Sequence, residues 1–453
     1  METKMKTMMP VEVVDTALVA PSEETPRQPL WLSNLDLVVP RRHTPLVYYY
    51  PASAQGQGGA SLAPDRLKAA LAGALVPFYP LAGRLGGAAP DGRLQIDCNG
   101  EGALFVVARA EHLAGDEIFE GYAPSPEIRR AFVPSSEPVD DDDAASCPVA
   151  MFQVTLLRCG GVVLGTAIHH VVSDGVSSFQ FIQTWAGLAR GLAVGAEAAA
   201  CGPLPVHDRT LLRARRPPCP TSDHLDYSPA FPTRRLRPSP TRVYPVSPKL
   251  LADLRSRCGS GVSAFAAVAA HLWRCVCVAR GAAAAPAGSD TTHLGLPVNV
   301  RRRLRPPLPD GYFGNALVRG LVTAPVGDVL DGSLGSVAAA IRRAVDGVDD
   351  AYARSLVDYL ELELGDAASG QAVASESEQR VPAWDLWVVS WLGMPMYSAD
   401  FGSGAPGLVA PAHMFSPGQA LVTPCANGDD GITVLLAMEP EHIKCFEKAF
   451  YGE

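Results

Sequence analysis

The sequence lacks the features that mark several large classes of protein. No run of about 20 apolar residues, the length needed to span a bilayer, occurs in the 453 residues. Residues 1–9 contain Lys4 and Lys6 without an apolar segment of about 7–15 residues behind them, so they do not predict a secretory signal. The net charge is −9, and the nearest approach to a basic run is the short cluster 301–303. These absences argue against membrane spans and nucleic-acid partners, and we expect a cytoplasmic protein.

The ten cysteines are scattered through the chain and form no dense framework. In the absence of a secretory signal, reduced thiols in a cytosolic protein are the simplest interpretation. Cys275 and Cys277 stand two residues apart, which could suggest a metal pair. Residues i and i+2 of a helix do not face the same way, so we interpret both as core residues and expect no bound metal.

The length predicts more than one domain, because a single hydrophobic core stops growing well below 453 residues. Periodic helix-like and strand-like segments run to about residue 192 and resume near Tyr244, with an Ala-, Gly- and Pro-rich stretch between them. We therefore predict an N-terminal domain at 1–195, a crossover linker at 196–225 and a C-terminal domain at 226–453. Both halves mix helix-like and strand-like segments, so the predicted fold class is α/β. Nothing in the sequence demands more than a monomer.

Strand-like runs at 151–157 and 162–168 are separated by Cys159, Gly160 and Gly161, which predicts a hairpin with its turn there. The segment HHVVSDG at 169–175, which follows the second run, is the most informative for chemistry. Successive strand residues point to opposite faces, so His169 and His170 cannot easily share one task. The same alternation disfavours a metal site made of both histidines and Asp174. The residues alone leave three interpretations open: a buried structural histidine, a His/Asp acid–base site and a metal site.

The residues that follow Asp174 predict a helix that ends near Arg190. We expect Ser177 or Ser178 to cap its N-terminus. The expected apolar stripe is formed by Phe179, Phe181, Ile182 and Trp185.

Two motifs make the chain resemble the BAHD acyltransferases. The segment HVVSDG at 170–175 resembles the HxxxD-G motif of that family, and DFGSG at 400–404, with Asp400, Gly402 and Gly404, resembles its second motif, DFGWG. Further segments resemble hydroxycinnamoyl-CoA transferases of the family: LWLSNLD at 30–36, PFYPLAGRL at 77–85, DRTLLRAR at 208–215 and GYFGN at 311–315. The resemblance covers most of the chain.

The resemblance implies two similar-sized chloramphenicol-acetyltransferase-like domains, each a mixed β-sheet flanked by helices, with a solvent channel between them. It implies acyl-CoA as a co-substrate, no permanently bound cofactor and a small-molecule acceptor. His170 would be the general base, since a neutral imidazole with a pKa near 6.5 suits proton transfer at neutral pH. Trp391 would donate its indole N–H to the tetrahedral oxyanion, a contribution of roughly 3 kcal/mol; the alternative for Trp391 is core filling.

The resemblance also assigns supporting roles. Asp174 would form a salt bridge with Arg301 and act structurally. Tyr48 would seat the phenolic end of a hydroxycinnamoyl group, with an ordinary strand aromatic as the alternative. Asn315 is grouped with the substrate-binding residues, and the DFGSG loop is expected to be structural.

Departures from the family pattern bear on the acceptor. Ser403 replaces the tryptophan of DFGWG, Leu46 stands where a small polar residue is common, and Val389 occupies the place of a threonine that contacts the acceptor. In the family, an arginine that would bind a shikimate carboxylate precedes the position of Trp391. The residue at the expected place in this chain is Glu376.

Arg380 could replace that arginine if the loop contains an insertion, whereas Glu376, Glu378 and Asp385 favour a cationic acceptor such as putrescine or agmatine. O-acylation of shikimate, quinate or another polyol is the alternative. A catalytically silent acyl-CoA-binding protein is the non-enzyme alternative, and a metal-dependent hydrolase using the histidine pair is disfavoured.

Overall fold

The computed structural model describes residues 11–52, 62–86, 92–135, 147–192, 202–235, 239–281, 291–368, 380–382, 385–425 and 431–452. The chain divides into two compact units, each assembled from separate segments. The first unit comprises Met1–Arg213, Pro307–Ala316 and Met394–His413, and the second comprises Ala214–Pro306, Leu317–Gly393 and Met414–Glu453. The predicted boundaries treated each domain as one continuous stretch, whereas two short later segments belong to the first unit.

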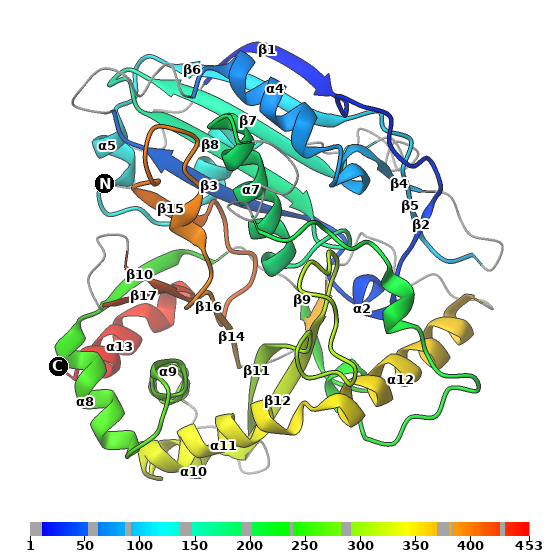
Figure 1. Cartoon of the computed structure of the whole chain (residues 1–453). Coiled ribbons are helices and arrows are strands. Elements are labelled where there is room, and N and C mark those ends of the chain that lie inside the picture. Colours follow the sequence, from blue (N-terminus) through cyan, green and yellow to red (C-terminus); the bar gives the residue numbers. More distant parts are fainter. Residues whose placement is uncertain are drawn as a thin grey trace. The chain divides into compact units, whose positions relative to one another are not determined.

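A six-stranded mixed sheet forms the centre of the first unit (Figure 1). In spatial order its strands are β1 (Glu12–Val19), β6 (Ala103–Ala110), β7 (Ala150–Leu157), β8 (Val162–His169), β3 (His43–Tyr50) and β15 (Leu408–Pro411). Only the β6–β7 pair is parallel. The β7–β8 hairpin confirms the turn predicted at Gly160, whose φ of 79° suits glycine.

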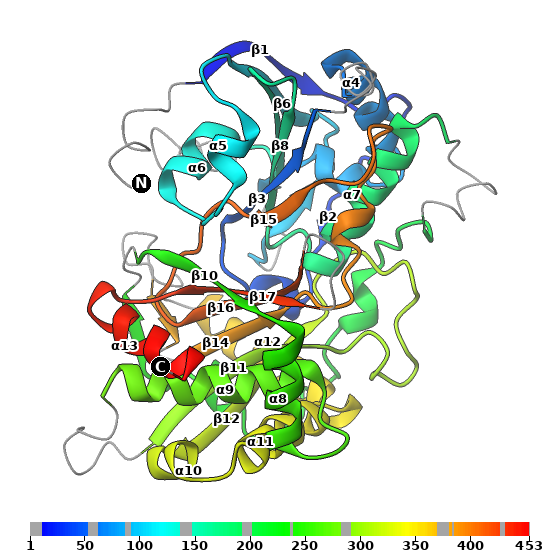
Figure 2. The same ribbon diagram turned by 90° about the vertical axis from the view of Figure 1, so that its left-hand side faces the viewer.

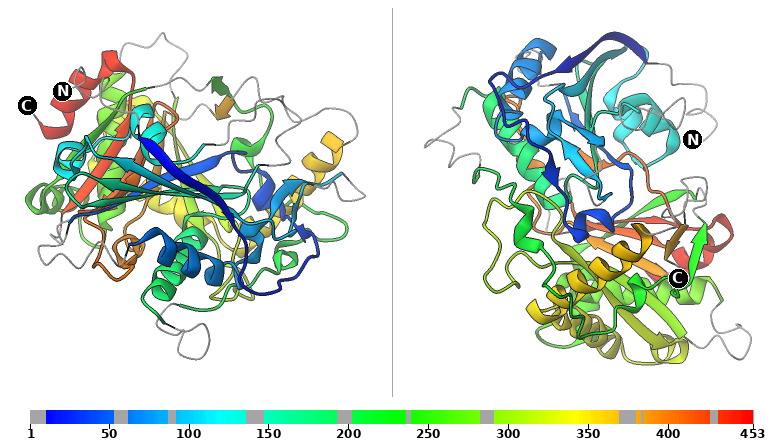
Figure 3. Two further views of the ribbon diagram at one scale, coloured as in Figure 1. Left: turned by 90° about the horizontal axis from the view of Figure 1, so that it is seen from above. Right: turned by 90° about the vertical axis from the view of Figure 1, so that its right-hand side faces the viewer.

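Helices cover both faces of this sheet (Figures 2 and 3). The helices and short helical turns of the unit are α2 (Asn34–Leu37), α4 (Pro64–Ala74), η1 (Tyr79–Ala82), α5 (Gly115–Phe119), α6 (Pro126–Phe132), α7 (Gly175–Ala189), η4 (Arg209–Leu212) and η7 (Met396–Ser398). Phe132 of α6 packs with Val163 and Met151 on one face. On the other, Phe181 and Trp185 of α7 pack on Phe152, as the predicted stripe requires. A small sheet joins β2 (Leu30–Trp31), β5 (Gln95–Asp97) and β4 (Arg84–Gly86).

The second unit also has a six-stranded mixed sheet. Its strands, in spatial order, are β10 (Thr241–Val246), β17 (Ile432–Ala437), β16 (Gln419–Pro424), β14 (Leu386–Ser390), β11 (Thr291–Asn299) and β12 (Leu317–Pro325), and β9 (Thr233–Arg235) pairs with β13 (Arg380–Pro382). The helices are η5 (Leu225–Tyr227), α8 (Pro248–Cys258), α9 (Ala264–Ala279), α10 (Val326–Leu330), α11 (Leu334–Gly347), α12 (Asp350–Ala368) and α13 (Pro440–Tyr451).

Helix α9 is the core helix of the second unit, and it packs against α8, α11 and α13. Cys275 and Cys277 on α9 are both buried, which confirms their interpretation as core residues. No helix in the part of the chain that the structure describes combines the length and apolarity needed to cross a bilayer. Two units, each with a mixed sheet flanked by helices, agree with the predicted α/β class.

Candidate active site

The HxxxD segment forms a turn between the end of β8 and the start of α7. Strand β8 is buried throughout and pairs His169 with His43 of β3. His170 follows directly, and its backbone N–H donates to the carbonyl oxygen of Arg42 at 2.9 Å. The N–H of Val172 donates to the carbonyl oxygen of His169 at 2.9 Å. The turn is therefore a continuation of the β3–β8 pairing and has a defined backbone.

Asp174 is the N-cap of α7, so the predicted caps Ser177 and Ser178 are wrong. One Asp174 carboxylate oxygen accepts from the N–H of Ser177 at 3.0 Å, and α7 begins at Gly175. A carboxylate is a strong N-cap because it satisfies a free N–H and interacts favourably with the positive end of the helix dipole. The Ser177 hydroxyl is used elsewhere: it lies 3.0 Å from the carbonyl oxygen of Gly314 and 3.1 Å from its nitrogen.

The other Asp174 oxygen accepts from the N–H of Ala316 at 3.1 Å. Asp174 is 1% exposed, so it joins the start of α7 to the 314–316 segment from inside the first unit. These contacts are structural in kind. Arg301 belongs to the second unit, where its backbone N–H donates to the Asn299 side chain at 3.0 Å. The salt bridge between Asp174 and Arg301 stays a prediction.

His169 and His170 have different surroundings. The His169 ring is buried against the His43 ring, with centroids 5.0 Å apart, and its Nδ1 accepts from the N–H of Val171 at 3.3 Å. Burial, followed by the nearby charge of His43, lowers the pKa of His169 to about 3. His169 is therefore a neutral histidine with a place in the fold.

Of the two neighbouring histidines, His170 is the one with an incomplete set of hydrogen bonds. Its Nδ1 is buried and has no hydrogen-bond partner among the described residues. Burial lowers the pKa of His170 below 6.5, and Arg42 acts in the same direction, whereas the Asp174 carboxylate and Asn315 oppose the shift. The imidazole is consequently neutral at pH 7, which is the state that a general base requires.

Tyr48 lies on β3 between Leu164 of β8 and Val409 of β15. It is fully buried, and its hydroxyl has no hydrogen-bond partner among the described residues. Burial raises the pKa of Tyr48, so the phenol stays protonated. An unsatisfied buried hydroxyl is costly, and a polar group of a bound ligand would satisfy it.

Trp391 and Val389 lie in the second unit, at the end of β14. Trp391 is 9% exposed, and its backbone N–H donates to the carbonyl oxygen of Val422 at 2.8 Å. Val389 is half-buried and pairs with Leu421 of β16. Their predicted roles toward the oxyanion and the acceptor stay predictions.

The DFGSG loop has contacts that are structural in kind, all within the first unit. One oxygen of Asp400 accepts from the N–H groups of Gly402 at 2.7 Å and Gly404 at 2.9 Å. Both glycines have positive φ values, 103° and 92°, which a side chain would disfavour. Phe401 is fully buried and lies edge-on to Trp185 of α7, with centroids 5.1 Å apart.

The carboxylates expected to meet a cationic acceptor fall into two groups. Glu376 and Glu378 lie outside the described residues, and of Arg380 the structure describes the backbone in β13. Asp385 is described: its carboxylate accepts from the Thr292 hydroxyl and from the His293 N–H, each at 2.8 Å. Asp385 therefore serves the fold of the second unit and is a poor candidate for an acceptor site. Within the described ranges, no three His, Cys, Asp or Glu side chains converge to hold a metal ion.

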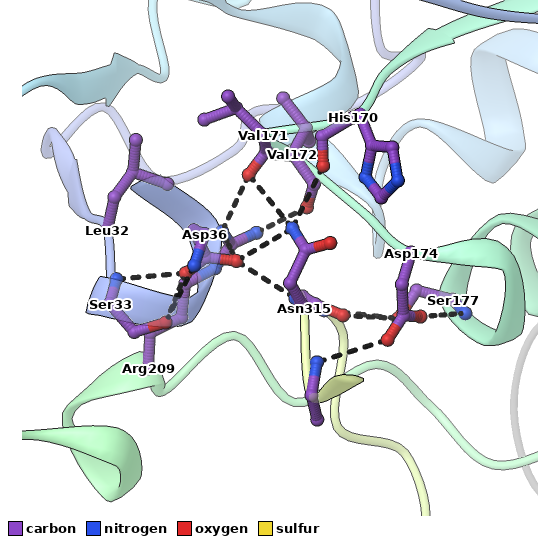
Figure 4. A network of polar contacts seen from close by, with 12 residues as sticks. Leu32, Ser33, Asp36, His170, Val171, Val172, Asp174, Ser177, Arg209 and Asn315 are labelled. Atoms are coloured by element: carbon purple, nitrogen blue, oxygen red, sulfur yellow. Dashed lines mark hydrogen bonds and ion pairs between the residues drawn. The ribbon is translucent and has the colours of Figure 1, made fainter. Parts of the chain in front are cut away.

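A buried polar network beside His170 was missed by sequence reasoning (Figure 4). Asp36 and Arg209 form an ion pair at 2.9 Å with both side chains fully buried. Asn315 donates to Asp36 from its backbone N–H at 2.9 Å and from its side-chain amide at 3.0 Å. The amide nitrogen of Asn315 bonds to protein atoms, whereas its Oδ1 is buried and has no hydrogen-bond partner among the described residues. Binding of substrate by Asn315 stays a prediction. The only sequence signal was that all three residues lie in segments resembling the family.

This chain is similar to known proteins in both sequence and fold. A family model described as "Transferase family" matches residues 9–452. Putrescine hydroxycinnamoyltransferase 1 of Oryza sativa subsp. japonica is 44% identical, over 98% of this chain and 99% of that protein. Shikimate O-hydroxycinnamoyltransferase of Nicotiana tabacum is 37% identical, over 98% of this chain and 100% of that protein. The crystal structure of vinorine synthase has the same fold, with a TM-score of 0.74 at 21% identity over 98% of each chain.

Proposed function

The chain belongs to this transferase family, the BAHD acyltransferases, and on that premise we propose that it transfers a hydroxycinnamoyl group from CoA to an aliphatic polyamine such as putrescine or agmatine. As a member of the family it is an acyltransferase with an acyl-CoA co-substrate. The observation that carries the chemistry is the neutral His170 at the end of β8, whose buried Nδ1 has no partner among the described residues. The acceptor class is supported by the similarity to the putrescine enzyme at 44% identity.

In the proposed reaction the acceptor nitrogen attacks the thioester carbonyl carbon directly. His170 takes the proton from the attacking amine as the C–N bond forms. When the tetrahedral intermediate collapses, the C–S bond breaks and the proton passes to the thiolate, which leaves as CoA. Trp391 would donate its indole N–H to the oxyanion of the intermediate. No acyl-enzyme is required, because both substrates meet beside the same base.

The charge of a polyamine sets a condition on this reaction. An alkylammonium has a pKa near that of lysine, about 10.4, so a buried imidazole cannot deprotonate it efficiently. The reacting amine must bind in its neutral form, which desolvation favours. The distal ammonium needs a carboxylate partner, and since Asp385 is engaged in its own unit, Glu376 and Glu378 are the proposed partners.

O-acylation of shikimate, quinate or another polyol is the second candidate. It is supported by the similarity to the shikimate enzyme at 37% identity. Val389 argues against it, because an isopropyl side chain cannot make the acceptor hydrogen bond of the threonine expected there.

A competition assay tests the acceptor. Purified enzyme is given p-coumaroyl-CoA with equimolar putrescine, agmatine, spermidine, shikimate, quinate and glycerol, and the products are separated by mass. We expect a p-coumaroyl amide of an aliphatic amine as the main product. A shikimate or quinate ester in its place would overturn the amine assignment but keep the acyltransferase. Binding of p-coumaroyl-CoA without release of CoA for any acceptor would instead indicate a silent homologue.

A further inference from the structure

The backbone of the catalytic turn is held by side chains from two distant segments. The amide of Asn315 donates to the carbonyl oxygen of His170 at 2.9 Å and lies 3.3 Å from that of Val171. The guanidinium of Arg209 donates to the carbonyl oxygen of Val172 at 2.6 Å and lies 3.4 Å from that of Val171. Three consecutive carbonyl oxygens of the turn are therefore fixed by buried donors (Figure 4).

Asp36 connects the two donors. One of its carboxylate oxygens lies 2.9 Å from Arg209 Nη1 and accepts both N–H contacts from Asn315. The other accepts from the Ser33 hydroxyl at 2.7 Å and the Ser33 backbone N–H at 2.9 Å, which completes the capping box of α2. One carboxylate thus organises the guanidinium and the amide that hold the turn.

The energetics of such a network favour a role beyond stability. Both partners of the Asp36–Arg209 pair are fully buried. Removing two charges from water costs free energy that a buried ion pair regains only with near-ideal geometry, so an apolar replacement is often as stable. The planar fork of a guanidinium, unlike a flexible ammonium, fixes several acceptors in one plane. The network therefore suits precise placement of the turn better than it suits stabilisation.

The position of the turn matters because the turn carries the His170 ring. In many acid–base sites a carboxylate hydrogen-bonded to the imidazole sets its direction. Here Nδ1 has no hydrogen-bond partner among the described residues, so packing and the position of the main chain must orient the ring.

We propose that Asp36, Arg209 and Asn315 are positioning residues, which fix the main chain of residues 170–172 and through it the direction of the His170 imidazole. The proposal rests on the proposed function, in which His170 is the base. In this role they act on His170 and take no proton in the reaction.

The decisive variant is Arg209→Lys, which keeps the charge beside Asp36 but cannot hold both carbonyl oxygens. We expect kcat to fall by roughly 10- to 100-fold, the range that a displacement of about 1 Å produces, with both KM values within about threefold of the original. Arg84→Lys is the matched control. Arg84 is also buried, pairs with Glu101 at 3.1 Å and donates to the carbonyl oxygens of Gly83 and Gly102, both at 2.8 Å, without contacting the turn. We expect it to lose thermal stability and keep its kcat.

The same Arg209→Lys change is then made in a His170→Ala background. A positioning residue acts through His170, so it should cause no further loss of the residual rate. An equal loss in both backgrounds, or an equal fall of kcat in Arg84→Lys, would overturn the proposal in favour of a general structural role. Full activity of His170→Ala would overturn the assignment of His170 as the base, on which the proposal rests, and this outcome separates the two failures.

If Arg209→Lys does not fold, Asn315→Leu replaces it, because it removes the amide donors at similar volume and leaves the ion pair in place. Its control is Gln153→Met, which removes another buried amide that donates to the carbonyl oxygen of Ala131 at 2.7 Å. A fall of kcat in Asn315→Leu that Gln153→Met lacks would support the proposal, and equal kcat values would reject it.

Discussion

The HxxxD turn and the DFGSG loop of the first unit have similar backbone hydrogen bonds but carry different side chains. In each, an aspartate carboxylate accepts two backbone N–H groups: Asp174 those of Ser177 and Ala316, and Asp400 those of Gly402 and Gly404. The first region leaves a histidine nitrogen without a partner among the described residues, and the second leaves the Ser403 hydroxyl without one and buries Phe401 completely. A fixed backbone and an unsatisfied buried group are therefore common to both motifs, and the imidazole, which can act as a base at neutral pH, distinguishes the one that can do chemistry.

Replacing His170 is expected to have the largest effect. His170→Ala removes the proposed base, and we expect kcat to fall by about 10²- to 10⁴-fold, as for other acid–base residues. CoA release from p-coumaroyl-CoA measures the rate. His112→Ala, an exposed histidine of the same unit, is the control and should keep the original kcat. An unchanged rate in His170→Ala would leave the HxxxD turn without a chemical role.

Replacing Phe401 should lower the stability provided by the DFGSG loop without affecting catalysis at the HxxxD turn. Phe401→Ala leaves a cavity beside Trp185 and Tyr50, and we expect a loss of about 3–5 kcal/mol in the free energy of unfolding. Urea denaturation measures this loss. The kcat of the folded enzyme should change by less than about threefold, because the loop touches no reacting atom. A large fall of kcat with normal stability would show that the two motifs cannot be separated in this way.

The paired aspartates sharpen the comparison further. Asp174→Ala and Asp400→Ala each remove a carboxylate that accepts two N–H groups, and we expect each to cost roughly 2–3 kcal/mol of stability. Only Asp174→Ala should also lower kcat, since it frees the start of α7 four residues after His170. Measuring kcat at a temperature where both variants are folded separates the effects. Equal kcat values would assign Asp174 no influence on the base.

Features that depend on residues close together in the sequence could be predicted, and features that depend on contacts between distant segments could not. The β7–β8 hairpin follows from local alternation and the Gly160 turn, and it appears as predicted. The N-cap of α7 was misassigned because the sequence offers Asp174, Ser177 and Ser178 within five positions, and tertiary contacts with Gly314 and Ala316 decide among them. These contacts join segments more than 130 residues apart.

The network behind His170 was not predictable from pattern. Asp36, Arg209 and Asn315 are separated by more than 100 residues at each step, and a buried ion pair leaves no periodic signal in a sequence. Resemblance marked their segments and grouped Asn315 with the substrate-binding residues, but it gave no role to Asp36 or Arg209. The inclusion of 307–316 and 394–413 in the first unit is equally non-local.

The smallest expected effect concerns the two adjacent histidines and pH. His169 has a folded pKa of about 3 and an unfolded value near 6.5. As pH falls below 6.5, His169 takes up a proton in the unfolded state before it does so in the folded state. The contribution of His169 to the free energy of unfolding is therefore complete above pH 6.5 and is lost progressively toward pH 3. At pH 5 the loss is roughly 2 kcal/mol.

Urea denaturation at pH 7 and pH 5 is compared between the original protein and His169→Gln. Burial also lowers the pKa values of His43, His207 and His413, so the contribution of His169 is the part of the loss that the variant lacks. The pKa of His170 is also lowered by burial, so kcat at saturating acceptor, where the amine is already bound in its neutral form, should fall only below pH 6.5, where the base becomes protonated. A fall of kcat beginning above pH 7 would place the active proton on another group. The two titrations thus separate the histidine that holds the fold from the one that moves the proton, although they are neighbours in the chain.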